Sequence, residues 1–141
     1  MPYSNSEWEA QLDRTLRNRY SASLMNDTKW REVWAIVCAL ELQVQMNYAD
    51  NPSYGGAKVL HGPFKPDYIE DRGIRDPGIG GPFLYKQILW LRVPKSSPND
   101  NSSFREQVDA LGNVPITEND EYFEVRGYEY DAGEPGNAAL S

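Results

Sequence analysis

The segment from Leu84 to Val93 constrains the fold more than any other part of this sequence. It is rich in Leu, Ile, Tyr and Trp, and it is apolar on both alternating faces: Ile88 and Trp90 share one face, Leu89 and Leu91 the other. Successive side chains of a strand point to opposite faces, so a strand of this kind needs apolar cover on both sides. The segment therefore predicts a central strand of a buried sheet.

Two N-terminal helices are predicted from capping residues followed by apolar residues at helical spacing. Ser6 and Glu9 have the spacing of a capping box, and apolar residues then recur four positions apart, which predicts a helix over about residues 7–19. The run Asn26-Asp27-Thr28 can cap a second helix. The apolar residues of this second helix form one stripe, which consists of Trp30, Val33, Trp34, Val37 and Cys38.

The remaining elements complete an α+β fold. Alternation over residues 40–48 predicts a strand with one buried face, Gly and Pro residues make 50–82 a long loop region, and a helix over 103–111 precedes a last strand over 121–131. We expect a mostly antiparallel sheet built from 40–48, 83–93 and 121–131, with the helices packed on it. Because Met25 stands directly before a helix cap, we divide the chain into an N-terminal helical extension, residues 1–24, and a single α+β domain, residues 25–141.

Length and charge limit the classes of function. A chain of 141 residues is the size of one domain, and its net charge of −7 disfavours nucleic acid and anionic membranes as partners, because both attract an excess of Lys and Arg. The longest apolar run, residues 34–40, is far shorter than the roughly 20 residues that cross a bilayer. The N-terminus lacks the basic start and apolar core of a signal peptide, so we expect a cytoplasmic protein.

Most of the negative charge lies in residues 118–134. This segment carries seven carboxylates and one arginine, a net charge of −6. We predict that it forms an interface for a basic protein, with Tyr122 as amphipathic contact area. The predicted interface residues are Glu118, Asp120, Glu121, Tyr122, Glu124, Arg126, Glu129, Asp131 and Glu134.

The last predicted strand needs one irregularity to present these acids together. Strict alternation places Tyr128 and Tyr130 on the face opposite Phe123 and Val125. A bulge at Gly127, a residue type that tolerates positive φ, returns both tyrosines to the face of Phe123 and Val125. With this bulge, an acidic ridge faces outward, made of Glu124, Arg126, Glu129 and Asp131.

No motif predicts catalysis, a metal site or a cofactor. His61 is the only histidine and Cys38 the only cysteine, which leaves no soft ligand set and no internal disulfide. The run Gly78-Ile79-Gly80-Gly81 lacks the Lys-Ser/Thr of a P-loop and the spacing of a dinucleotide fingerprint. Paired carboxylates such as Glu121 and Glu124 are compatible with glycoside hydrolysis, but a dense local run of acids is more often a solvated face.

The loop region 50–82 is the second candidate surface, because loops of this length in a compact domain are usually functional or mobile. Its charged residues are Asp71, Arg72, Arg75 and Asp76. The alternative interpretation is a solvated loop whose charges pair locally. A pocket that holds His61, Tyr85 or Trp90 would favour a small-ligand protein or an enzyme that uses 50–82 as a lid.

Three motifs resemble those of a family of small uncharacterised bacterial proteins over about residues 26–130. They are Thr28-Lys29-Trp30, the run from Gly81 to Leu91 (GPFLYKQILWL), and Val125-Arg126-Gly127-Tyr128. The family carries no established activity, so the resemblance implies no catalytic residue. Small acidic bacterial proteins of this kind are compared with immunity proteins of polymorphic toxin systems, which implies a toxin as partner.

We therefore expect a non-enzymatic protein-binding module, most concretely an immunity-type inhibitor that covers the basic surface of a toxin or nuclease with its acidic C-terminal strand. Two alternatives stay open at this point. One is the small-ligand protein or enzyme described above, and the other is a structural domain with no dedicated site.

Overall fold

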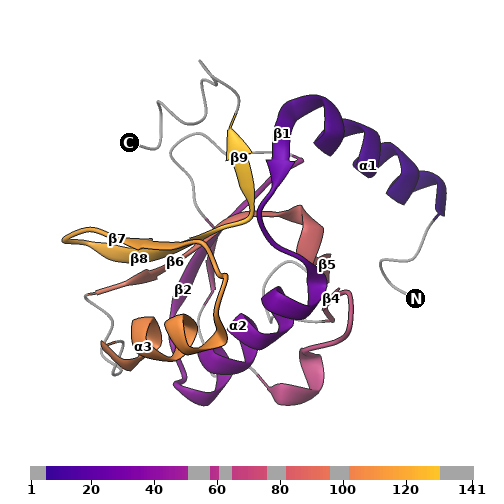
Figure 1. Cartoon of the computed structure of the whole chain (residues 1–141). Coiled ribbons are helices and arrows are strands. Elements are labelled where there is room, and N and C mark those ends of the chain that lie inside the picture. Colours follow the sequence, from indigo (N-terminus) through magenta and orange to yellow (C-terminus); the bar gives the residue numbers. More distant parts are fainter. Residues whose placement is uncertain (1–5, 51–57, 61–64, 76–81, 96–101, 131–141) are drawn as a thin grey trace.

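The computed structural model describes residues 6–50, 58–60, 65–75, 82–95 and 102–130, and this part of the chain has the predicted α+β fold (Figure 1). Its helices are α1 (Ser6–Arg19), α2 (Asp27–Ala39) and α3 (Ser102–Leu111). An antiparallel five-stranded sheet has the order β3-β2-β6-β8-β7. The bounds of its strands are β2 Val44–Tyr48, β3 Lys58–Leu60, β6 Ile88–Pro94, β7 Ile116–Glu118 and β8 Tyr122–Arg126.

Two small antiparallel sheets accompany the main one. In the first, β1 (Tyr20–Ser23) pairs with β9 (Tyr128–Tyr130). In the second, β4 (Gly73–Ile74) pairs with β5 (Phe83–Leu84). Short 3₁₀ turns lie at Pro66–Tyr68 and Tyr85–Gln87.

The helix predictions are confirmed, and local chemistry explains the helix ends. The Asn26 Oδ1 atom accepts a hydrogen bond from the Lys29 backbone N–H at 2.8 Å, which caps α2. Gly112 follows α3 at φ 77°, a left-handed conformation that glycine adopts without steric cost. The predicted strand at 40–48 begins later, at Val44, because the Leu42 N–H donates back to the Val37 carbonyl at 3.1 Å and extends the end of α2.

The prediction of a central strand is confirmed for β6, but the predicted division of its faces is wrong. The 3₁₀ turn Tyr85–Gln87 separates β5 from β6. In β6, Trp90 pairs with Asn47 and Ile88 with Tyr48, so Leu89 is an extra residue, a β-bulge. The bulge puts Leu89 and Trp90 in one apolar cluster and Ile88 and Leu91 in the other.

These two clusters cover the two faces of the sheet. α2 and α3 lie on one face, where the larger cluster joins Val33, Trp34 and Phe104 to Val44, Leu91, Val125 and other buried residues (Figure 1). α1 covers part of the other face through the second cluster, which consists of Leu12, Leu16, Tyr20, Ala49, Leu84, Leu89, Trp90 and Tyr128.

The N-terminal segment makes further contacts across the predicted boundary at 24/25. β1 pairs with β9, and the Leu24 N–H donates to the Gly127 carbonyl at 2.9 Å. The Tyr20 hydroxyl donates to the Ala49 carbonyl at 2.7 Å, and its ring stacks on Tyr128 with 4.8 Å between centroids. The division into 1–24 and 25–141 stays a prediction.

The predicted bulge at Gly127 is wrong, because the chain changes sheets there. β8 ends at Arg126 in the main sheet, and β9 begins at Tyr128 beside β1. Gly127 is needed for close approach and not for positive φ: its N–H donates to the Leu89 carbonyl at 2.7 Å, and a Cβ would lie 2.2 Å from the Ile88 carbonyl oxygen. Tyr128 accordingly belongs to the second cluster, away from Phe123 and Val125.

Candidate functional site

Glu124, which the sequence placed on an outward acidic ridge, is buried. It is 4% exposed and lies between two arginines. Its Oε1 accepts from Arg92 Nε at 2.7 Å, and its Oε2 accepts from Arg126 Nη2 at 3.0 Å. A carboxylate is buried at acceptable cost only when cations and hydrogen bonds compensate its charge. The prediction that Glu124 faces solvent is therefore wrong, and its charge is not offered to a partner.

Arg92 is held between two aromatic rings on the same face. Its guanidinium lies 3.8 Å from the Trp90 ring centroid and 4.3 Å from that of Tyr122. Cation–π contacts of this geometry stabilise the arginine and fix the aromatic rings. Sequence reasoning missed Arg92. The signal was the spacing of two in Trp90-Leu91-Arg92 and in Tyr122-Phe123-Glu124, which places each pair on one face.

Glu118 lies on the opposite face of the sheet. It pairs in register with Phe123, whose side chain belongs to the helix-side core. Its carboxylate contacts Lys95 Nζ at 2.7 Å and Arg105 Nη1, from α3, at 3.5 Å. Glu118 thus joins the sheet to a helix and does not share a face with Glu124.

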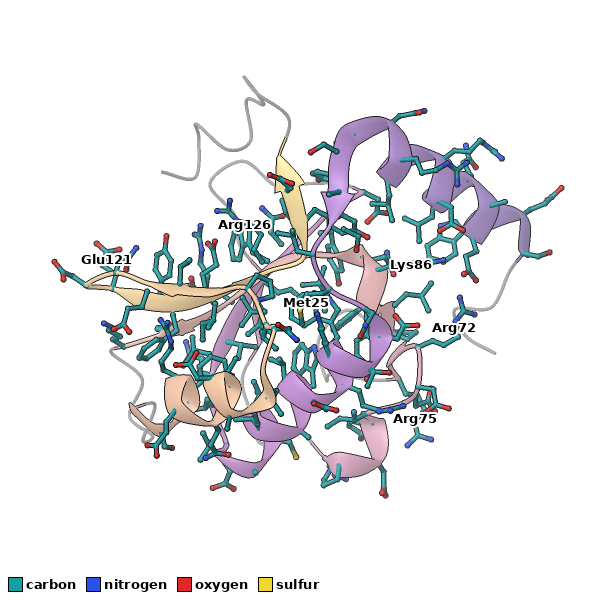
Figure 2. The ribbon with its side chains drawn as sticks, viewed as in Figure 1. Met25, Arg72, Arg75, Lys86, Glu121 and Arg126 are labelled. Carbon is teal, nitrogen blue, oxygen red and sulfur yellow. The ribbon has the colours of Figure 1, made fainter. Side chains whose placement is uncertain are left out.

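The turn between β7 and β8 carries two exposed acids, Asp120 and Glu121. Figure 2 shows Glu121 at the far end of this hairpin. Asn119 Oδ1 accepts from the backbone N–H groups of Glu121 and Tyr122 at 2.8 and 2.9 Å, and the Lys95 N–H donates to the Glu121 carbonyl at 2.8 Å. The turn is therefore held by the Asn119 side chain and by a backbone hydrogen bond from Lys95, the residue after β6. Within the described ranges, neither carboxylate has an ion-pair partner.

A pocket of about 670 Å³ opens beside this turn. Its lining residues come from β2, from the end of β6 and from the hairpin turn: Gln45, Arg92, Pro94, Lys95, Asp120, Glu121 and Tyr122. The two lining cations have carboxylate partners that do not line the pocket, Glu124 for Arg92 and Glu118 for Lys95. The unpaired charge of the pocket is therefore that of Asp120 and Glu121.

The other predicted interface residues are not brought to this pocket. Glu129 is exposed on β9, in the sheet that β9 forms with β1, away from the hairpin end (Figure 1). Asp131 and Glu134 lie outside the described residues. The structure thus groups Asp120, Glu121, Tyr122, Glu124 and Arg126 at one hairpin, places Glu118 on the opposite face of that hairpin, and puts Glu129 in another sheet.

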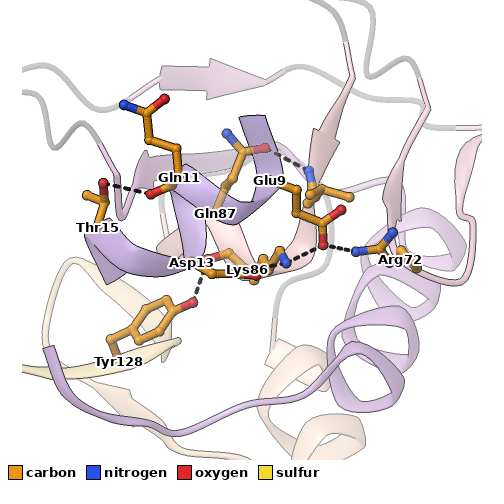
Figure 3. A network of polar contacts seen from close by, with 9 residues as sticks. Glu9, Gln11, Asp13, Thr15, Arg72, Lys86, Gln87 and Tyr128 are labelled. Carbon is orange, nitrogen blue, oxygen red and sulfur yellow. Dashed lines mark hydrogen bonds and ion pairs between the residues drawn. The ribbon is translucent and has the colours of Figure 1, made fainter. Parts of the chain in front are cut away.

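The second candidate surface is tied to the helices by ion pairs. Asp71 contacts Arg31 of α2 at 2.8 Å, and Arg72 contacts Glu9 of α1. Lys86 contacts the same Glu9 and also Asp13, at 2.8 Å (Figure 3). The Lys86 and Arg72 hydrogen bonds to its carboxylate lower the pKa of Glu9 below its ordinary value. The charges of this surface pair with neighbouring elements, so they hold the loop to the body of the protein.

Arg75, also in this surface, lies against its own loop. It contacts the Asp67 carbonyl at 3.4 Å and the Tyr68 ring at 5.4 Å from the centroid. Asp76 and His61 lie outside the described residues.

The residues proposed for a ligand pocket in the loop region are packed inside the protein. Tyr85 and Trp90 are 0% and 1% exposed, and the Tyr85 hydroxyl donates to the Glu70 carbonyl at 2.6 Å. In the described part of the chain, no group of three His, Cys, Asp or Glu residues is arranged to hold a metal ion. None of the described helices is long and apolar enough to cross a membrane.

Comparisons with protein-family models, with curated proteins and with solved structures give no match to this chain. The resemblance to small bacterial immunity-type proteins therefore stays a prediction. Any functional argument must come from the geometry of the hairpin and its pocket.

Proposed function

We propose that this chain is a non-enzymatic, cytoplasmic protein-binding module that uses the β7–β8 turn to bind a basic protein surface, as an immunity-type inhibitor of a toxin or nuclease does. The observation that carries the proposal is the pair of exposed carboxylates of Asp120 and Glu121 at the rim of the pocket, which have no ion-pair partner among the described residues. They stand next to Tyr122, whose half-buried ring offers amphipathic contact area.

The electrostatics of the hairpin support a basic partner. The net charge of −7 attracts a cationic protein over long range, and the two unpaired carboxylates give that attraction a point of contact. Unpaired charges at an interface act mainly on the rate of association, and salt weakens their effect. The acidic segment thus contributes through fewer residues than its composition indicates, because buried Glu124 pairs with Arg92 and Arg126, and exposed Glu118 pairs with Lys95 and Arg105.

The rigidity of the hairpin also supports a recognition role. Arg92 is fixed by Glu124 and by the rings of Trp90 and Tyr122, and Asn119 fixes the turn. Binding to a surface that is already ordered loses less conformational entropy than binding to a mobile loop.

The test compares two charge-reversed variants with the same change in net charge. The interface variant is Asp120→Lys with Glu121→Lys, and the control is Glu32→Lys with Glu106→Lys, two exposed acids on α2 and α3. Proteins captured from the source cells by the immobilised chain are identified, purified and titrated against each variant by calorimetry at low and at physiological salt.

We expect a basic partner whose affinity for the interface variant is lower by about tenfold or more, whereas the control variant binds within about twofold of the wild type. Equal losses in both variants would show that only net charge matters. A partner that binds all three proteins alike would also contradict the proposal. Capture alone, without this difference, does not support it.

A further inference from the structure

We propose that the pocket beside the β7–β8 turn is a receptor for the side chain of one arginine of the protein partner. The inference rests on the proposed function and deepens it, because it names the group that the site recognises. It follows from the charge of the lining, from the residues at the pocket wall and from the order of the turn.

The charge of the lining selects a cation. Arg92 and Lys95 are already paired with Glu124 and Glu118, so they do not compensate Asp120 and Glu121. A carboxylate or phosphate entering the pocket would bring a further negative charge beside two unpaired ones. A guanidinium instead gives each carboxylate a charge-assisted partner, in the planar geometry that a carboxylate accepts.

The wall of the pocket suits the rest of an arginine side chain. Tyr122 and Pro94 line it with apolar surface against which a methylene stem can pack. Gln45, from β2, adds an amide that both donates and accepts hydrogen bonds. The volume of about 670 Å³ exceeds the needs of one side chain, so backbone next to the arginine also fits.

The turn fixes the backbone that carries the two carboxylates. Asn119 Oδ1 accepts from two consecutive backbone N–H groups, and the Glu121 carbonyl accepts from the Lys95 N–H. Arg92 contacts the Tyr122 ring at 4.3 Å from its centroid and so fixes this part of the wall. An arginine therefore meets an ordered backbone and an ordered Tyr122 ring, which favours specificity over general attraction to a negative surface.

The experiment uses the whole chain, labelled with ¹⁵N, and four capped tripeptides of the form Gly-X-Gly. X is arginine, lysine, citrulline or glutamate, where citrulline has the shape of arginine without its charge. Backbone NMR shifts of residues 119–122 report binding. The variant Asp120→Asn with Glu121→Gln is compared with a matched control, Glu32→Gln with Glu106→Gln, and unchanged spectra elsewhere show that each variant is folded.

We expect saturable shifts at residues 119–122 with the arginine peptide, weaker ones with lysine, and none with citrulline or glutamate at the same concentration. Neutralising Asp120 and Glu121 lowers the affinity for the arginine peptide by about fivefold or more, since two exposed charge pairs are lost. The control variant binds as the wild type does. Binding of citrulline as tight as that of arginine, or an unchanged affinity of the neutralised variant, would overturn the proposal.

These outcomes are separable from those of the proposed function. If the peptides do not bind but a basic partner still loses affinity on charge reversal of Asp120 and Glu121, the inference of an arginine-binding pocket is wrong and the proposed protein-binding role holds. If the arginine peptide binds selectively but no partner shows that loss, the receptor holds and the proposed function is wrong.

Discussion

Replacing Glu124 by glutamine tests whether its buried carboxylate stabilises the fold. Glu124 is 4% exposed, and the side chain of its partner Arg92 is 11% exposed, so the substitution leaves an arginine in a largely buried position without its carboxylate. Removing one partner of a buried pair costs about 3–5 kcal/mol. Because the second partner, Arg126, has 37% of its side chain exposed and is partly solvated, we expect a loss of about 2–4 kcal/mol in the free energy of unfolding.

Urea denaturation followed by circular dichroism measures this loss. With a slope of about 2 kcal/mol per molar urea, in the middle of the range for small proteins, the midpoint of Glu124→Gln falls by about 1–2 M. Glu121→Gln is the matched control, and its exposed carboxylate predicts a change within about 0.5 kcal/mol. If both variants unfold at the same urea concentration, the buried ion pair does not stabilise the fold as the structure implies, and the reasoning about Glu124 fails.

Three further predictions test other parts of the structure. Leu16 belongs to the cluster that joins α1 to the sheet, so Leu16→Ala is expected to lower the free energy of unfolding by about 2–5 kcal/mol. A urea midpoint equal to that of the wild type would show that α1 is not packed against the sheet. Gly127→Ala places a Cβ 2.2 Å from the Ile88 carbonyl oxygen, so β6 and the 126–128 segment must separate. We expect loss of the dispersed NMR spectrum, or a decrease of about 3 kcal/mol or more in the free energy of unfolding. A variant as stable as the wild type would contradict the close approach. Lys86 and Arg72 depress the pKa of Glu9, so its ion pairs stabilise the fold above pH 4.5, the ordinary pKa, and cease to do so as the pH falls through the lowered pKa. The difference in urea midpoint between wild type and Glu9→Gln is therefore expected to disappear at low pH. A difference that does not change with pH would contradict the assignment.

The helices were predictable because their signals are local. The cap at Asn26 and the apolar stripe of α2 specify a helix from neighbouring residues alone, and the same holds for α3 and the glycine after it. The central strand was predictable for a similar reason, since a segment apolar on both faces has no place at a solvent-exposed edge.

The errors concern features that depend on strand pairing. A glycine inside a strand pattern marks either a bulge or a close approach of another backbone, and the sequence does not distinguish the two at Gly127. The bulge lies instead at Leu89, where nothing in the local sequence marks it. Only the register of β6 against β8 sets Arg92 opposite Glu124, so the burial of that carboxylate was not visible from alternation along one strand.

The same dependence explains why the charge of residues 118–134 overstates the charge available for binding. Glu118 and Glu124 are matched by cations from β8 and from other elements, namely Lys95, Arg105, Arg92 and Arg126. The acids that keep an uncompensated charge in the described hairpin are in its turn, where no neighbouring strand supplies a partner.

Mapping of the bound partner on the ¹⁵N-labelled chain tests the central claim most directly. We predict that the basic partner shifts or broadens the backbone signals of residues 119–122 and the side-chain signal of Gln45, and that it leaves the outer surfaces of α2 and α3 unchanged. Changes centred on those helices, with the hairpin turn unaffected, would contradict the account.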